Sequence, residues 1–148
     1  MKAFNAQRKI AASSEDILKS IEDSTLLGKW WGPAGFTITS NTFEFKPGGK
    51  WSFVMHGPDG KDYPNETIFR EISRPRKVAI RHDSNPHFTL TVSIEDVEDG
   101  STVSWHQEFD SEDVAKNIAH IAKPANEQIL DKLKTLIESA GSPSNRKD

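Results

Sequence analysis

The chain contains no cysteine among its 148 residues. This absence excludes disulfides, a thiolate nucleophile and zinc sites built from cysteine. No run approaches the roughly 20 apolar residues that a membrane span needs. The first ten residues, MKAFNAQRKI, also lack the apolar core of a secretory signal peptide. We therefore expect a cytoplasmic protein with no membrane span.

Basic residues are too dispersed to form a nucleic-acid surface. The net charge is −3, and the sequence has no dense run of Lys and Arg. Sequence-independent binding of nucleic acid needs such a patch, so we expect no nucleic-acid partner. Glycine-rich phosphate loops, nucleophile elbows and Walker motifs are absent as well. The sequence carries no catalytic motif, and we expect no cofactor.

The residues that are present suffice for one folded domain. A chain of 148 residues has the length of a single domain, and it buries roughly 68–70% of its unfolded surface. We assign residues 1–140 to this domain. Residues 141–148, GSPSNRKD, are predicted to form a disordered polar tail.

Two short helices are predicted after a first strand over residues 4–12. Ser13 begins a polar group typical of a helix start, and apolar residues follow at helical spacing. A second short helix is capped by Ser24 or Thr25 and ended by Gly32 and Pro33.

From residue 36 the apolar period changes to two, which predicts six strands joined by turns. Alternation is strictest at Phe88, Leu90, Val92 and Ile94. A change of parity near Ser40 indicates a bulge. One of the six strands is predicted to begin at Thr67. Short turns between consecutive strands imply an antiparallel meander.

A long helix from Ser111 is predicted to end the domain at Gly141. Because Pro124 removes a backbone hydrogen bond, we expect a kink or two abutting helices. One amphipathic helix against one sheet face makes a two-layer α+β fold, and an apolar hollow between them is the default ligand site. The predicted apolar stripe of this helix is Val114, Ile118, Ile121, Ala125, Ile129, Leu133, Leu136 and Ile137.

Several segments resemble the family named after the activator of Hsp90 ATPase homologue, within the START-like or Bet v 1-like (SRPBCC) superfamily. The matching segments are KWWGP at 29–33, KPGGKW at 46–51, MHGPDG at 55–60, YPN at 63–65 and KPANEQ at 123–128. The resemblance implies a helix-grip fold, in which a seven-stranded antiparallel sheet surrounds a long C-terminal helix. It also implies two short helices between strands 1 and 2, and a cavity between sheet and helix.

Many members of this superfamily bind apolar molecules, and they include lipid carriers, hormone receptors and aromatase/cyclases. Our leading hypothesis is therefore a non-enzymatic domain that binds a small apolar, aromatic or lipid-like molecule. One alternative is an enzyme of cyclase or hydrolase type. Another is a protein-interaction module such as an Hsp90 co-chaperone, although the Hsp90-activating proteins carry an additional N-terminal domain for which 148 residues leave no room. The sequence leaves monomer and homodimer open.

Three histidines on predicted strands are candidate metal ligands. His56, His82 and His106 fall on alternate strands, about 9–10 Å apart, which is too far to share a zinc ion. We expect no metal site. His82 shares parity with Val78 and Ile80, so it is predicted to face the core, where a neutral imidazole can orient a ligand or act as a base. The alternative is a satisfied core histidine.

Aromatic residues and a few polar ones complete the predicted cavity. Trp105 and Gln107 share a strand face, and Asn126 follows Pro124 on the long helix. The residues that we expect to line the cavity are Trp31, Phe36, Phe53, Met55, Phe69, His82, Leu90, Val92, Trp105, Gln107, Ile118, Ile121, Ala122 and Asn126.

Overall fold

The structure is a computed structural model, and it describes residues 2–140. The predicted tail at 141–148 lies outside these residues. The elements follow in the order β1 (Ala3–Ile10), α1 (Ser14–Glu22), α2 (Ser24–Trp30), β2 (Thr37–Phe43), β3 (Lys50–His56), β4 (Asp62–Ser73), β5 (Lys77–His82), β6 (Phe88–Val97), β7 (Gly100–Phe109) and α3 (Glu112–Ala140). The strands form one antiparallel sheet in the order β1-β7-β6-β5-β4-β3-β2, with β1 and β2 at its edges.

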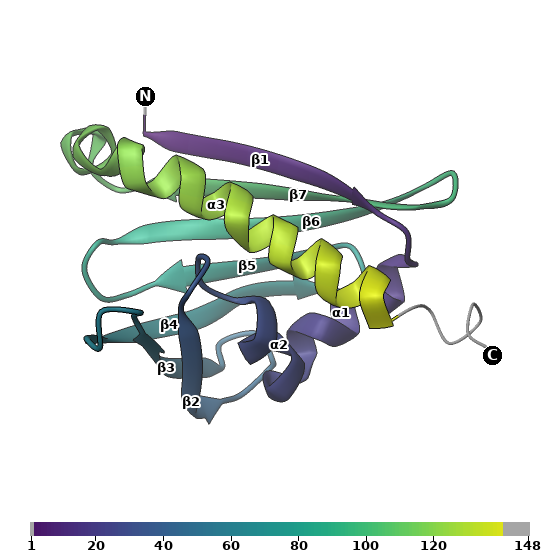
Figure 1. Cartoon of the computed structure of the whole chain (residues 1–148), viewed down its shortest axis with the longest axis horizontal. Coiled ribbons are helices and arrows are strands. Elements are labelled where there is room, and N and C mark those ends of the chain that lie inside the picture. Colours follow the sequence, from purple (N-terminus) through teal and green to yellow (C-terminus); the bar gives the residue numbers. More distant parts are fainter. Residues whose placement is uncertain (1, 141–148) are drawn as a thin grey trace.

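The long helix α3 crosses one face of this sheet, and α1 and α2 lie on the same side (Figure 1). The two short helices pack against each other, and α2 also contacts α3. This is the helix-grip arrangement that the sequence predicts, with two short helices between the first two strands. None of the helices within residues 2–140 is long and apolar enough to cross a membrane.

Local signals in the sequence set the ends of the short helices. The side chain of Ser13 caps α1 by accepting a hydrogen bond from the backbone N–H of Asp16. The cap of α2 is Asp23, whose carboxylate accepts from the N–H groups of Thr25 and Leu26 at 2.9 and 3.2 Å. The prediction of Ser24 or Thr25 as this cap was therefore wrong by one or two residues. A carboxylate at this position also suits the positive end of the helix dipole.

The strand β4 begins at Asp62, well before the predicted start at Thr67. Pro64 is unusual within a strand, because proline cannot donate to a neighbouring strand. In the structure this first part of β4 pairs only with β3, since pairing with β5 starts at Thr67. At Pro64 no residue of β5 lies opposite the strand, and proline is tolerated at such an edge.

The bulge predicted near Ser40 is present as a register shift between Ser40 and Thr42 in the β2–β3 pair. The turn that follows β2 brings two backbones together at Gly49. A Cβ atom there would lie 2.0 Å from the carbonyl oxygen of Glu44, so only glycine fits.

The helix α3 continues through Pro124 as one element, so two separate helices are not formed. Figure 1 shows its first turns nearly end-on and the remainder running across the sheet, which is a bend in the first half of the helix. The predicted apolar stripe was wrong in this half: Val114 is 36% and Ile121 is 60% exposed. Ala115 and Ala122 are buried in their place, since the bend turns the small residues toward the sheet.

The main core fills one end of the space between sheet and helices. It contains all four tryptophans, and the ring of Trp31 lies at their centre, with centroids 5.4, 5.0 and 5.3 Å from Trp30, Trp51 and Trp105. Such edge-on contacts are favourable between aromatic rings. The other end of the same sheet face is open.

Candidate ligand-binding site

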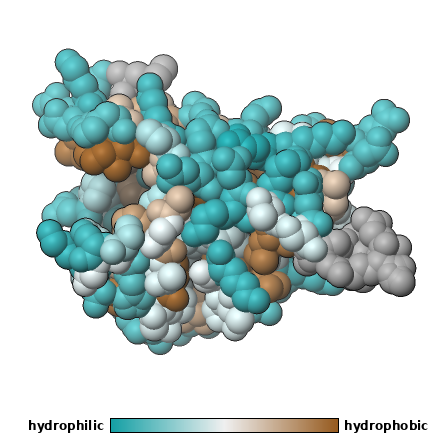
Figure 2. Space-filling model, viewed as in Figure 1, coloured by the Kyte–Doolittle hydropathy of each residue, from teal (hydrophilic) through white to brown (hydrophobic). Residues whose placement is uncertain are grey.

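A cavity of about 540 Å³ lies at the open end, between the sheet and the first half of α3. Five segments form its walls: the loop between α2 and β2, the inner faces of β3 to β7, the start of β4, the loop between β5 and β6, and α3. Figure 2 shows a hollow beneath the hydrophobic side chains that overhang it from the start of α3. Ile121, in the first half of α3, is 60% exposed and lines the cavity.

Eleven of the fourteen residues predicted for this cavity line it. They are Trp31, Phe36, Phe53, Met55, His82, Leu90, Trp105, Gln107, Ile121, Ala122 and Asn126. The strand register explains why they meet: Leu90 on β6 lies opposite Ile80 on β5 and Gln107 on β7. Side chains that share a face therefore form rows across the sheet.

Three predicted residues do not line the cavity. Phe69 and Val92 have the correct face, but they lie at the closed end, where they are 0% and 1% exposed in the main core. Ile118 packs instead with a smaller cluster around Phe4 and Phe109, beside β1. The alternation of residues along a strand predicts which face of the sheet a side chain lies on. It does not predict how far along the strand the cavity lies.

The prediction missed the polar rim at the start of β4. Asn65 and Thr67 line the cavity from the inner face of this strand, and Asp62, Tyr63 and Pro64 border it at the strand's first residues. Asn65 has the same parity as Thr67 and the buried Phe69. Extending the predicted strand back through Pro64 would therefore have placed Asn65 on the inner face. The other lining residues that were not predicted are Gly32, Pro33, Ile80, Asn85, Pro86, Phe88, Ala125 and Ile129.

A chain of polar groups crosses the cavity from β7 to α3. The indole nitrogen of Trp105 donates to Oδ1 of Asn126 at 3.2 Å, and Nδ2 of Asn126 donates to Oε1 of Gln107 at 3.0 Å. This fixes the amide of Gln107 so that its Nε2 points away from Asn126. Nε2 forms no hydrogen bond with another residue in 2–140, so its two hydrogens are unpaired within this part of the chain.

The loop between α2 and β2 is held onto α3 by two further contacts. Nζ of Lys132 donates to the carbonyl oxygen of Gly32 at 3.1 Å, and Oε1 of Gln128 accepts from the N–H of Ala34 at 3.1 Å. Burial lowers the pKa of Lys132. These contacts position Gly32 and Pro33 as a wall of the cavity.

His82 is the most buried ionisable group in the cavity wall, at 5% exposure. Its ring stacks on Phe88 with a centroid distance of 4.4 Å and an interplanar angle of 5°. Nδ1 lies 2.8 Å from the carbonyl oxygen of Pro86, and Nε2 lies 2.6 Å from Oδ1 of Asn65. Desolvation by burial is the main cause that lowers the pKa of His82.

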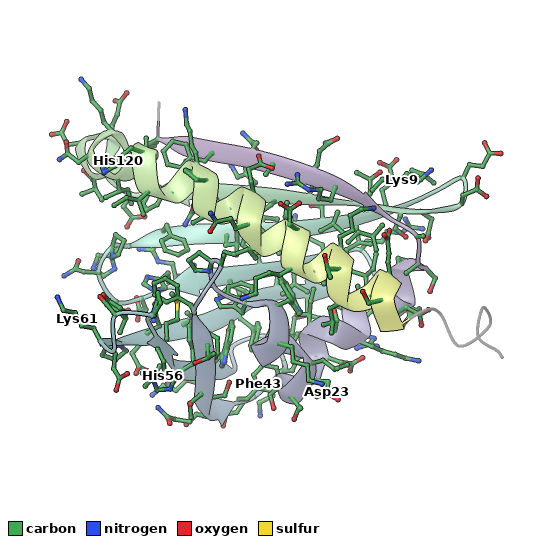
Figure 3. All side chains as sticks on the ribbon, viewed as in Figure 1. Lys9, Asp23, Phe43, His56, Lys61 and His120 are labelled. Atoms are coloured by element: carbon green, nitrogen blue, oxygen red, sulfur yellow. The ribbon has the colours of Figure 1, made fainter. Side chains whose placement is uncertain are left out.

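A hydroxyl, an imidazole and a carboxylate are also linked on the outer face of the sheet. Thr39 Oγ1 lies 2.8 Å from Nε2 of His56, whose Nδ1 lies 2.8 Å from Oδ1 of Asp62. Figure 3 labels His56 on β3, near the β2 edge of the sheet. Thr39 and His56 lie outside the cavity, and the side chains of His56 and Asp62 are 38% and 64% exposed. These hydrogen bonds link β2, β3 and β4. Because water competes for bonds this exposed, we assign them a structural role only.

Metal ligation has no support in the described residues. Among residues 2–140, no three His, Cys, Asp or Glu side chains are grouped closely enough to hold a metal ion. Every fully buried polar side-chain atom in this part of the chain lies within hydrogen-bonding distance of another polar atom.

The sheet, the gripping helix and the cavity define a helix-grip protein. The chain belongs to the family described as Activator of Hsp90 ATPase homolog 1-like protein, whose model matches residues 11–138. None of the curated proteins matches the sequence.

Solved structures with the same fold come from several bacteria. A protein from Nitrosomonas europaea has a TM-score of 0.86 at 17% identity, over 94% of this chain and 96% of that one. A protein from Arthrobacter aurescens has a TM-score of 0.86 at 21% identity, over 99% and 93%. An AHSA1-like protein from Aeromonas hydrophila has a TM-score of 0.77 at 19% identity, over 99% of both chains. At these identities the likeness concerns the fold.

Proposed function

We propose that this chain binds a small apolar molecule with an aromatic or lipid-like body between the sheet and α3. The cavity carries this proposal. Its volume of about 540 Å³ falls within the range of roughly 300–1,000 Å³ that is usual for small-molecule sites. Aromatic and aliphatic side chains dominate its lining, and a few polar groups converge on it, which is the composition that such sites share.

The polar groups divide into two ends that can orient a ligand. Gln107 offers donor hydrogens near α3, while His82 and Asn65 lie on β5 and β4. The apolar wall between them includes Leu90, which lies next to Gln107 across the β6–β7 pair. A molecule with polar groups at its ends and an apolar middle is the best match to this wall.

Binding without turnover fits the state of His82 better than catalysis does. A general base needs a free nitrogen within hydrogen-bond reach of a substrate proton. Both ring nitrogens of His82 contact oxygen atoms of the protein, at 2.6 to 3.0 Å. Since the sequence also carries no catalytic motif, we rank the cyclase or hydrolase alternative second.

Native mass spectrometry of gently purified protein tests the proposal. We expect a bound small molecule whose mass is lost on denaturation, and a rise of Tm with members of a lipid and aromatic library. Ala125→Phe should abolish both by filling the cavity from α3, whereas Asn117→Phe on the exposed side of the same helix should not. No bound mass and no shift of Tm, combined with retention of an Hsp90-type chaperone in a pull-down, would favour the protein-interaction alternative.

A further inference from the structure

The hydrogen-bond surroundings of His82 restrict the class of ligand more narrowly than the shape of the cavity does. Nδ1 faces two backbone carbonyl oxygens, of Ser84 at 3.0 Å and of Pro86 at 2.8 Å. Nε2 faces Oδ1 of Asn65 at 2.6 Å. All three neighbours are acceptors. Only the doubly protonated, positively charged ring has a hydrogen for each side.

Turning the amide of Asn65 over does not remove this conflict. Its Nδ2 donates to the carbonyl oxygen of Tyr63 at 2.8 Å. With the amide reversed, Oδ1 would face that carbonyl oxygen and the conflict would only move from His82 to Tyr63. Exchanging the tautomer of the neutral ring is no better, since Nδ1 would then direct its lone pair at two carbonyl oxygens.

The charged form that would satisfy these acceptors is disfavoured by its place in the fold. His82 is 5% exposed and stacked on Phe88. Burial lowers the pKa of His82, and it outweighs the contacts to the Pro86 and Ser84 carbonyl oxygens, which act in the opposite direction. A neutral ring has one N–H, which can serve the carbonyl oxygens at Nδ1 or Oδ1 of Asn65 at Nε2. One side of the ring therefore lacks a hydrogen for its hydrogen bond. An unsatisfied buried acceptor is costly, so a ligand that supplies the hydrogen gains affinity.

We propose that the cavity selects aromatic molecules that carry one weakly acidic hydroxyl, a phenol or an enol, and that this hydroxyl donates to Nε2 of His82. The inference rests on the proposed function, because it names the ligand class of the same cavity. Asn65 is half-buried on the cavity wall, and binding requires its amide to rotate away from Nε2. The hydroxyl oxygen then takes the place of Oδ1 beside His82, and the ring of the ligand lies against the apolar wall.

Three probes with one ring system test this directly: 2-naphthol, 2-methoxynaphthalene and naphthalene. Binding can be followed by the quenching of tryptophan fluorescence, since Trp31 and Trp105 lie in the cavity wall. We expect 2-naphthol to bind about ten-fold more tightly than 2-methoxynaphthalene, which is the effect of one hydrogen bond to a buried group. In ¹⁵N-histidine spectra, the Nε2 signal of His82 should shift toward that of a hydrogen-bonded nitrogen with 2-naphthol alone.

The His82→Phe variant keeps the stack on Phe88 and removes both nitrogens, so the preference for 2-naphthol should fall to within about two-fold. His56→Phe, on the outer face, is the matched control and should keep the full preference. Equal binding of 2-naphthol and 2-methoxynaphthalene by the unmodified protein would overturn the hydroxyl proposal and leave apolar binding intact. Failure of all three probes to bind would overturn both the ligand class and the proposed function.

Discussion

The indole nitrogen of Trp105 donates a hydrogen bond to Oδ1 of Asn126 across 3.2 Å, and both residues are buried. This bond ties β7 to α3 two residues after Pro124. Asn126 also donates to Gln107, so one amide serves two partners on β7. Asn126 therefore links α3 to two residues of β7 beside the cavity.

Asn126→Leu should lower the free energy of unfolding by about 2 kcal/mol, because it leaves the Trp105 nitrogen buried without an acceptor. Chemical denaturation monitored by circular dichroism measures this change. The control is Asn117→Leu on the exposed side of the same helix, for which we expect less than about 0.5 kcal/mol. Equal effects of the two variants would contradict the role assigned to Asn126.

The segment KPANEQ at 123–128 contains residues that hold α3 against the rest of the fold. Asn126 binds Trp105, and Gln128 and the nearby Lys132 hold the loop that carries Gly32. One stretch of α3 thus anchors both β7 and the wall beside α2. The contacts of this segment therefore help to set the fold.

Ile121 at the mouth of the cavity should affect binding without affecting stability. It is 60% exposed, so Ile121→Glu removes little buried area and should change Tm by less than about 2 °C. A charge beside an apolar entrance should weaken binding of 2-naphthol by about five-fold. Isothermal titration calorimetry gives the affinity. The control is Val97→Glu. Val97 is an apolar residue of 38% exposure that lies away from the cavity, so this variant should bind 2-naphthol normally.

Two glycines should differ in their tolerance of alanine for different reasons. Gly49→Ala would place a Cβ 2.0 Å from the Glu44 carbonyl oxygen, so we expect a loss of about 3 kcal/mol. Gly60 has φ +83° and open space around it, so Gly60→Ala should cost only about 1 kcal/mol through backbone strain. Urea unfolding of both variants checks the order. A smaller loss at Gly49 than at Gly60 would show that the β2–β3 turn can shift.

Much of the fold could be predicted because burial on one sheet face leaves a strict period of two in the sequence. The alternation from Phe88 to Ile94 gave β6, and parity placed His82 on the inner face. The error at β4 has a local cause, since Pro64 is a strand breaker everywhere except beside an unpaired edge. Asn65 was lost with that segment.

The position of the cavity along the sheet could not be predicted from period alone. Phe69 and Phe53 share the inner face and both belong to the main core, yet only Phe53 also lines the cavity. The difference depends on where the side chains of α1 and α2 end, and that is a property of tertiary packing. Likewise, the bend of α3 exchanged Ile121 for Ala122 on the buried side.

His82 should make the free energy of unfolding depend on pH below about 6.5, a range separate from that of the carboxylates. Burial lowers its pKa below the ordinary value of 6.5. As the pH falls through about 6.5, the unfolded chain takes up a proton at this ring before the folded chain does. The unfolded state then binds more protons, so the free energy of unfolding falls with falling pH until the folded pKa is reached.

The carboxylates with lowered pKa, such as Asp96 and Asp110, act in a separate window. Their unfolded values lie near 4, so they reduce stability only as the pH falls further. Urea unfolding at intervals from pH 7.5 to 5 should therefore show a loss of stability below 6.5 in the unmodified protein and a flatter profile in His82→Phe. His56→Phe serves as the control and should keep the slope. An identical slope in the unmodified protein and His82→Phe would show that His82 is not held neutral by its burial.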